Sequence, residues 1–216
     1  MMLRIRVSIR RYKLNKKRTS VLQIGRDEFF KPVKEIHNDK YSELLKKKFF
    51  LSVSHLYPYK NIETLIHTFN RLKEVDKDLY LVLAGSTQNI KYLEKLNNLI
   101  SYYNLENSIN FLGNLNREEL KLFYSKCYSL VFTSPFENFA YTLVEAMSCG
   151  APIICTNTTA MPETCKKAAL YFDPYDIDQL FTQSKLLLID ESLREYLIKE
   201  SLVRANELDN YKNINI

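Results

Sequence analysis

From residue 49 onward, short apolar runs alternate with segments that have helical periodicity. Each run is four to six residues long and is followed by a glycine or a polar loop. Runs this short and this apolar are typical of strands that are buried on both faces. The expected strands cover residues 49–53, 79–84, 109–112, 130–133, 152–155 and 169–172.

Amphipathic helices are expected between these strands. Asn116, with Glu119 at the third helical position, forms a capping-box pattern, and Gly150 followed by Pro152 marks a helix end. Two closing helices are expected over residues 177–188 and 193–202. Because strand and helix alternate, the crossovers should be right-handed. The pattern predicts an α/β fold, a Rossmann-like parallel sheet with helices on both faces.

Residues 1–48 fit this alternation less well and differ in charge. They carry 15 Lys/Arg against 5 Asp/Glu, whereas the rest of the chain carries 16 against 20. Strand-like patterns occur at residues 5–9 and 21–25. This basic arm is compatible with a segment that packs on another part of the protein, or with contact to an anionic membrane. A nucleic-acid partner is not expected, because no nucleic-acid motif accompanies the charge.

The composition is that of an ordinary globular chain, with 46% hydrophobic and 26% charged residues. No apolar run is long enough to span a membrane, and no secretory signal is present, so we expect a cytoplasmic protein. The four cysteines form no C-x-x-C pair, so we expect reduced thiols and no zinc site. We divide the chain into a basic N-terminal arm, residues 1–48, and a ligand-binding domain, residues 49–216.

Ligands of a doubly wound sheet bind outside the carboxyl ends of its strands. The loop after the first expected strand holds His55 and Lys60, and we expect Lys60 to open the following helix. A lysine at the positive end of a helix dipole suggests a site for an anion such as a phosphate. A solvated loop lysine is the alternative interpretation.

Two glutamates stand near the end of the fourth expected strand. Glu137 lies in the loop, and Glu145 lies on the following helix between apolar neighbours. A glutamate in such surroundings needs a partner. A carboxylate can accept hydrogen bonds from two adjacent sugar hydroxyls, and a structural salt bridge is the alternative.

Four segments together resemble one family, the retaining group 1 glycosyltransferases (glycosyltransferase family 4) of the GT-B fold. FFLSVSHLYPYKNIETLIHTFNRL is similar to the start of the family's C-terminal domain, and INFLGNLNREELKLFYSKC to the strand and helix that follow. SPFENFAYTLVEAMSCGAPIICTN matches the family's pair of glutamates separated by seven residues. MPETCKKAALYFDPYD is similar to the next stretch, so the resemblance runs from about residue 49 to 205.

The resemblance implies an enzyme that transfers a hexose from a nucleotide-diphospho-sugar to a sugar or lipid-linked acceptor, in polysaccharide or lipopolysaccharide assembly. By this resemblance Lys60 and His55 would bind the donor diphosphate, Glu145 the ribose hydroxyls, and Glu137 the transferred sugar as the catalytic residue. Such an enzyme needs no metal or other cofactor. The backbone around Asn138, Phe139 and Ala140 would neutralise the leaving phosphates, and Asn114 and Leu115 would border the base.

The sequence departs from the family pattern at several points. Ser54-His55 stands where the family has Gly-Arg, and histidine lacks the guanidinium fork that holds phosphates. Asn138 and Ala140 replace glycines. Residues 1–48 resemble at most the last strand of the acceptor domain and the linker. We therefore expect a chain truncated at its N-terminus, and the alternative to an active enzyme is a nucleotide-sugar-binding domain or one half of a split enzyme with an acceptor-domain partner.

Overall fold

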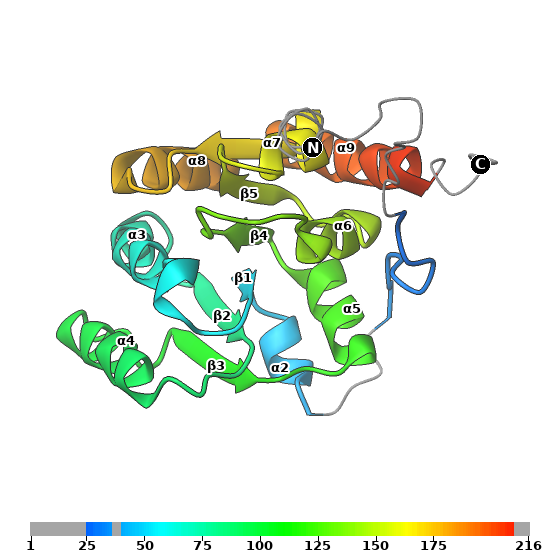
Figure 1. Cartoon of the computed structure of the whole chain (residues 1–216). Helices are drawn as coiled ribbons and strands as arrows, with labels where there is room; N and C mark the ends of the chain where they lie inside the picture. The colour runs from blue at the N-terminus through cyan, green and yellow to red at the C-terminus, as the bar shows by residue number, and fades with distance from the viewer. Residues whose placement is uncertain (1–24, 36–39, 210–216) are drawn as a thin grey trace, which may run out of the picture.

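Six parallel strands form one sheet in the computed structural model, which describes residues 25–35 and 40–209. The strand order is β3-β2-β1-β4-β5-β6 (Figure 1). The predicted parallel sheet is confirmed, and every predicted strand agrees with an observed one to within a residue at each end. The strands are β1 (Phe49–Val53), β2 (Tyr80–Ala84), β3 (Ile109–Gly113), β4 (Ser129–Phe132), β5 (Ile153–Thr156) and β6 (Ala169–Phe172).

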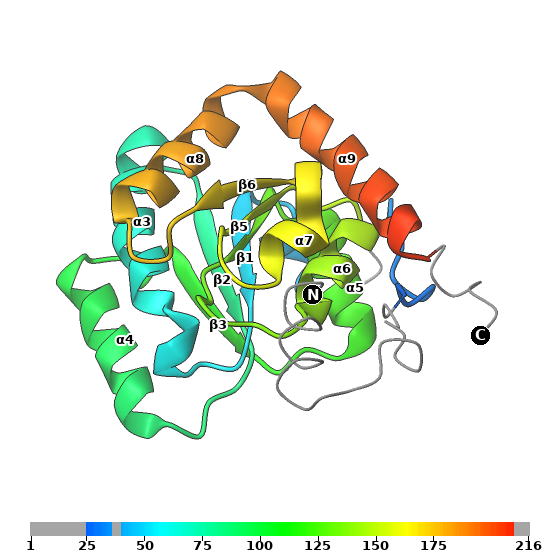
Figure 2. The same cartoon turned by 45° about the horizontal axis from the view of Figure 1, so that its top comes forward.

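Helices cover both faces of the sheet, as the alternating pattern predicts. One face carries α3 (Ile62–Val75), α4 (Ile90–Tyr102) and α8 (Ile177–Ile189). The other face carries α5 (Arg117–Lys126) and α6 (Tyr141–Ser148). The last described helix, α9 (Glu191–Asp209), starts beside α8 and runs along α6 (Figure 2). The short elements are α2 (Ser42–Leu45), η2 (Pro58–Lys60), α7 (Met161–Cys165) and η3 (Lys166–Ala168).

The central strand shows why continuous apolar runs form this sheet. Phe49 and Leu51 of β1 pack in the core on the α5 and α6 side, whereas Phe50 packs in the core on the α3 side. Successive side chains of a strand point to opposite faces, and here both faces are covered. An alternating apolar and polar pattern would have left one of these cores without its side chains.

The described part of the N-terminal stretch packs against the sheet domain. Phe30, Tyr41 and Leu45 are buried in the core on the α5 side. The four-residue helix α2 is too short to show a periodicity, and the sequence analysis does not predict it. The expected strand at residues 5–9 lies outside the described residues, as does all of the 21–25 segment except Gly25. No helix within the described ranges is both long and apolar enough to cross a membrane.

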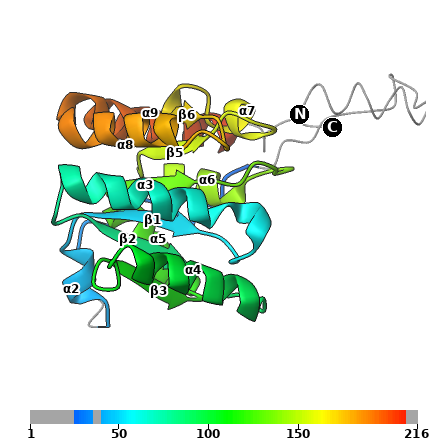
Figure 3. The ribbon, with the colours of Figure 1, turned by 90° about the vertical axis from the view of Figure 1, so that its left-hand side faces the viewer.

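The sheet order places a crevice at its centre. The chain leaves β1 towards β2 on one side, and later returns to β4 on the other side, so the loops after β1 and β4 diverge. Ligands of such sheets bind at this switch point, outside the carboxyl ends of the strands. Figure 3 shows α3 and α4 lying alongside the strands, so each begins at the carboxyl edge.

Candidate functional site at the carboxyl edge of the sheet

The loops after β1 and β2 are hydrogen-bonded to each other at the carboxyl edge of the sheet. Ser54 donates its backbone N–H to Ala84 O at 3.0 Å, and Leu56 donates to Ser86 O at 3.0 Å. Gly85 lies between them with φ +131°, and a Cβ on this residue would lie 2.0 Å from the carbonyl oxygen of Ser54. Only glycine fits this approach.

An open cleft of about 240 Å³ lies above the ends of β1 and β2. It brings together three of the predicted site residues, His55, Asn114 and Leu115, although Asn114 and His55 are far apart in the sequence. His55 is exposed there. The cleft is lined by Val53, Ser54, His55, Ala84, Gly85, Asn114, Leu115, Leu120 and Thr142. The position of this cleft agrees with the binding edge that the strand pattern predicts.

Lys60 and Glu137 form an ion pair across the switch point. Lys60 Nζ lies 2.5 Å from Glu137 Oε1, and the two side chains are only 14% and 19% exposed. The Thr133 hydroxyl, at the end of β4, donates to the carbonyl oxygen of Lys60 at 2.7 Å. The structure therefore joins the loops after β1 and β4 through the two charged residues that the sequence analysis singles out.

The expectation that Lys60 opens a helix is corrected by the structure. Lys60 is the last residue of the short helix η2, and α3 starts two residues later at Ile62. Asn61 between them has φ +56° and donates its side-chain N–H to Pro174 O at 2.7 Å. Asparagine adopts this left-handed backbone more readily than most residues, and the resulting kink separates the two helices.

The loop that carries Glu137 is held by hydrogen bonds to the loop after β5. Glu137 donates its backbone N–H to Thr159 Oγ1 at 3.2 Å, and the Thr158 hydroxyl donates to Pro135 O at 2.7 Å. Thr159 has φ +50°, which is a strained backbone for a β-branched residue. Thr159 is not among the residues predicted from the sequence. The threonine-rich segment directly after the fifth expected strand, at the binding edge, could have indicated its role.

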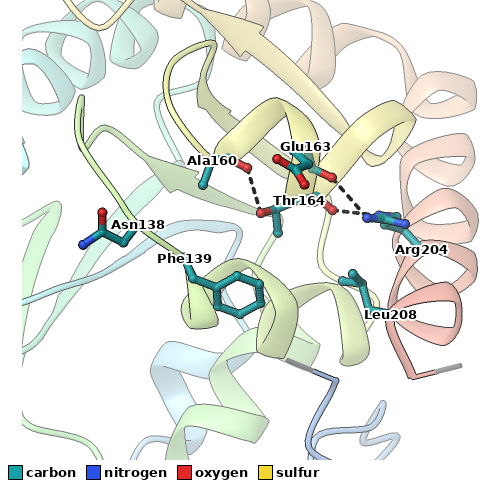
Figure 4. A pocket seen from close by; sticks show the side chains of 7 residues that line it. All are labelled: Asn138, Phe139, Ala160, Glu163, Thr164, Arg204 and Leu208. Atoms are coloured by element: carbon teal, nitrogen blue, oxygen red, sulfur yellow. Dashed lines mark hydrogen bonds between the residues drawn. The ribbon is translucent and has the colours of Figure 1, made fainter. Parts of the chain in front are cut away.

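The three backbone positions predicted to bind phosphate do not share one environment. Asn138 and Phe139 line a small pocket of about 20 Å³ rather than the cleft above β1 (Figure 4). Ala140 is buried and precedes α6. Arg204 of α9 forms the far wall of the pocket, where its Nε donates to Thr164 O at 2.8 Å. The roles of these three backbone positions stay predictions.

Glu145 is half-buried on α6, and its partner is a tyrosine rather than a salt bridge. The Tyr124 hydroxyl of α5 donates to Glu145 Oε2 at 3.1 Å. Burial raises the pKa of Glu145, while the Tyr124 hydrogen bond and the nearby Arg117 lower it. Tyr124 is not predicted from the sequence, because its position in the helix gives no sign of a role beyond the core.

Two helices that begin beside the switch point lack a side-chain cap. The residues that precede α3 and α6, Asn61 and Ala140, make no capping hydrogen bond. By contrast, Asn89, Asn116 and Asp176 cap α4, α5 and α8, and the Asn116 to Glu119 capping box is confirmed. Backbone N–H groups at an uncapped helix start favour an anion. The start of α6 therefore has backbone N–H groups that no side-chain cap satisfies.

The thiols and acidic residues suggest no metal centre in the described ranges. Cys127, Cys149, Cys155 and Cys165 are buried and free. Between residues 25–35 and 40–209, no three His, Cys, Asp or Glu side chains lie close enough together to hold a metal ion. The side chains that gather at the carboxyl edge are suited to binding an anion and hydroxyl groups.

The chain matches the family described as Glycosyl transferases group 1 over residues 33–203. It is similar to the serotype-specific mannosyltransferase WbdA of Escherichia coli, with 34% identity over 169 residues, or 77% of this chain and 20% of that protein. It is also similar to the O-antigen chain mannosyltransferase B of Escherichia coli, with 29% identity over 157 residues, or 73% of this chain and 41% of that protein.

Solved structures share the fold. Anabaena HepE, in complex with UDP and glucose, superposes with a TM-score of 0.83 at 20% identity, over 97% of this chain and 58% of that chain. The C-terminal domain of a group 1 glycosyl transferase, LpcC from Francisella tularensis, superposes with a TM-score of 0.74 at 18% identity, over 83% of this chain and 95% of that chain. The described fold is therefore that of a C-terminal GT-B domain, and the chain spans less than half of each of the two curated relatives.

Proposed function

The chain belongs to the group 1 glycosyltransferases, and on that premise we propose that it holds the donor of a retaining hexosyl transfer. The donor is a nucleotide-diphospho-sugar. One observation carries the proposal: Lys60 and Glu137 pair across the switch point of the sheet, beside an open cleft, and Glu145 lies on the helix that follows the Glu137 loop.

Each group has a chemical task in this proposal. The leaving nucleotide diphosphate gains negative charge as the sugar departs, and Lys60 together with the uncapped start of α6 stabilises it. Glu137 contacts the transferred sugar, and its ion pair keeps Lys60 at the site before the donor arrives. Glu145 accepts hydrogen bonds from the ribose hydroxyls. Asn114 and Leu115 border the base, and His55, which lines the same cleft, binds the diphosphate with Lys60.

The substrate class is proposed from the relatives. Two similar proteins are named as mannosyltransferases, one of them for the O-antigen chain. We infer that this chain serves the assembly of a surface polysaccharide or lipopolysaccharide, with mannose as the first hexose to test. Contact of the basic residues 1–48 with a membrane or a partner chain stays a prediction, because most of that stretch lies outside the described residues.

Binding tests the proposal without requiring turnover. Calorimetry with UDP, GDP, UDP-glucose and GDP-mannose should identify one nucleotide that binds. Glu145→Ala should then lose about tenfold or more of that affinity, because a hydrogen bond to a charged group is worth about 1.5–3 kcal/mol. Equal affinity in the parent and the variant contradicts the assignment of Glu145, and binding of none of the four ligands contradicts the proposed function.

Binding without transfer is the second candidate function. It is favoured by the described residues, which form one Rossmann-like unit and superpose on only 58% of a solved chain. Assays with a radiolabelled hexose donor distinguish the two functions, because a binding domain retains donor affinity and releases no labelled product.

A further inference from the structure

The hydroxyl of Tyr124 occupies a fixed position in the core. Its side chain is fully buried, and its ring packs edge-to-face against Phe30 with a centroid distance of 5.9 Å. The hydroxyl donates to Glu145 Oε2 at 3.1 Å, and Glu145 Oε1 accepts no hydrogen bond from the described residues. One carboxylate oxygen is therefore held by the protein, while the other has its hydrogen-bonding capacity left.

The pair lies next to the open cleft. Leu120 of α5 and Thr142 of α6 both line the cleft. Tyr124 follows Leu120 by four residues and Glu145 follows Thr142 by three, so each lies one helical turn further along the same face of its helix. Glu145 does not itself line the cleft, and it lies one helical turn behind a residue that does.

We propose that Tyr124 is a positioning residue, which orients the Glu145 carboxylate towards the ribose hydroxyls of the donor. This inference rests on the proposed function. A flexible glutamate loses rotamer freedom when it binds a diol, and a side chain that is already held loses less. Tyr124 does not touch the nucleotide. It acts by fixing one carboxylate oxygen, so that the remaining lone pairs face two adjacent hydroxyls.

The electrostatic surroundings of Glu145 agree with this role. Burial raises the pKa of Glu145, whereas the Tyr124 hydroxyl and Arg117 lower it, and Asp27 raises it. The Cys149 thiol, whose pKa burial raises to about 12, also interacts electrostatically with the carboxylate. Burial keeps the pKa of Tyr124 well above its ordinary value, so Tyr124 stays a neutral donor. Loss of the hydroxyl should therefore raise the pKa of Glu145 and favour its protonated form.

The test compares Tyr124→Phe with the parent, using UDP and 2′,3′-dideoxy-UDP, or the corresponding guanine nucleotides if the parent binds those. We expect the variant to bind the ribonucleotide about three- to tenfold more weakly, which is less than for Glu145→Ala, because the carboxylate keeps its own hydrogen bonds to the ribose and loses only its fixed orientation. Affinity for the dideoxynucleotide should change less than twofold. The acid limb of ribonucleotide binding should move to higher pH in the variant.

Tyr128→Phe is the matched control. Tyr128 lies at the opposite, amino end of β4, and its hydroxyl donates to Leu187 O at 3.2 Å. This variant also loses a tyrosine hydroxyl, but its nucleotide affinity and pH profile should remain those of the parent. If Tyr124→Phe does not fold, replacement of Tyr124 by 4-fluorophenylalanine fills the space of the oxygen without supplying a donor.

The outcomes separate this inference from the function on which it rests. A parent that binds no nucleotide contradicts the proposed function and removes the basis of the inference. If the parent binds but Tyr124→Phe loses both ligands equally, or neither, Tyr124 is a core residue alone. An unchanged acid limb has the same meaning, since a purely structural loss moves affinity without moving the ionisation of Glu145.

Discussion

At the scale of single residues, Glu145 stands in a place that favours ligand binding over stability. Its carboxylate is half-buried on a helix whose neighbouring residues belong to the core, and burial raises its pKa. An acid with a raised pKa in the folded state binds protons more tightly there than in the unfolded chain. The ionised form that the proposed site requires therefore costs folding free energy at neutral pH.

Glu145→Gln should relieve this cost. The amide oxygen can still accept from Tyr124, and it carries no charge to bury. Folded Glu145 titrates above its unfolded value, so the parent loses stability relative to the variant as the pH rises through these two pKa values. Urea unfolding of both proteins from pH 4 to pH 8 measures this. We expect equal stability at the acid end and a more stable variant at pH 8, and a variant that is less stable at pH 8 contradicts the argument.

Lys60 should recognise phosphate rather than nucleoside. Its ammonium group lies 2.5 Å from Glu137 and is mostly enclosed, so a diphosphate would meet a charge that is already in position. Lys60→Ala should weaken binding of a nucleoside diphosphate about tenfold, as expected for a charge-assisted hydrogen bond, and leave the free nucleoside unchanged.

Lys126→Ala is the control for Lys60→Ala. Lys126 is a lysine at the end of α5, and its ammonium donates to Lys34 O on an exposed surface. Its loss should leave both affinities unchanged. If Lys60→Ala weakens the nucleoside and the diphosphate by the same factor, Lys60 supports the loop and does not bind phosphate.

At the scale of elements, the strands and their edge could be predicted, because burial on both faces leaves a direct mark in the sequence. Contacts between distant loops left no such mark. The kink at Asn61, which moves the helix start beyond Lys60, depends on Pro174, 113 residues away. The strained backbone of Thr159 and the partner of Glu145 depend in the same way on tertiary packing.

A substitution at Gly85 tests the close contact between the loops after β1 and β2, which lies at the cleft. Gly85→Ala would place a methyl group 2.0 Å from the Ser54 carbonyl oxygen, at a φ of +131°. Because the backbone itself must move, we expect a loss of about 3 kcal/mol or more in unfolding free energy. The loss should be visible in urea titration, together with loss of nucleotide binding.

Gly113→Ala supplies the comparison. Gly113 ends β3 with φ +65°, and a Cβ there meets nothing within 4 Å. For Gly113→Ala we expect only the cost of the left-handed backbone, a loss of about 1–2 kcal/mol in unfolding free energy. Similar losses for the two variants show that the close contact between the loops after β1 and β2 is not what demands glycine at Gly85.

At the scale of the whole molecule, the sheet order, the cleft and the family agree. A parallel sheet of order β3-β2-β1-β4-β5-β6 has its switch point between β1 and β4. The Lys60 to Glu137 ion pair spans that point, and the cleft opens on its β2 side. The fold superposes on 58% of a solved glycosyltransferase-like chain at 20% identity, with a TM-score of 0.83. Fold and family are therefore established.

The last prediction concerns turnover by this 216-residue chain. We expect it to bind a nucleotide sugar and to show no measurable transfer when it is assayed by itself. Its described residues provide one Rossmann-like unit, and transfer requires an acceptor held in line with the donor carbon. Such positioning is worth about 7–11 kcal/mol of barrier, so donor binding by this unit without a held acceptor should leave transfer slower by several orders of magnitude. Robust transfer by the purified monomer contradicts this, because it places both substrates on the one domain.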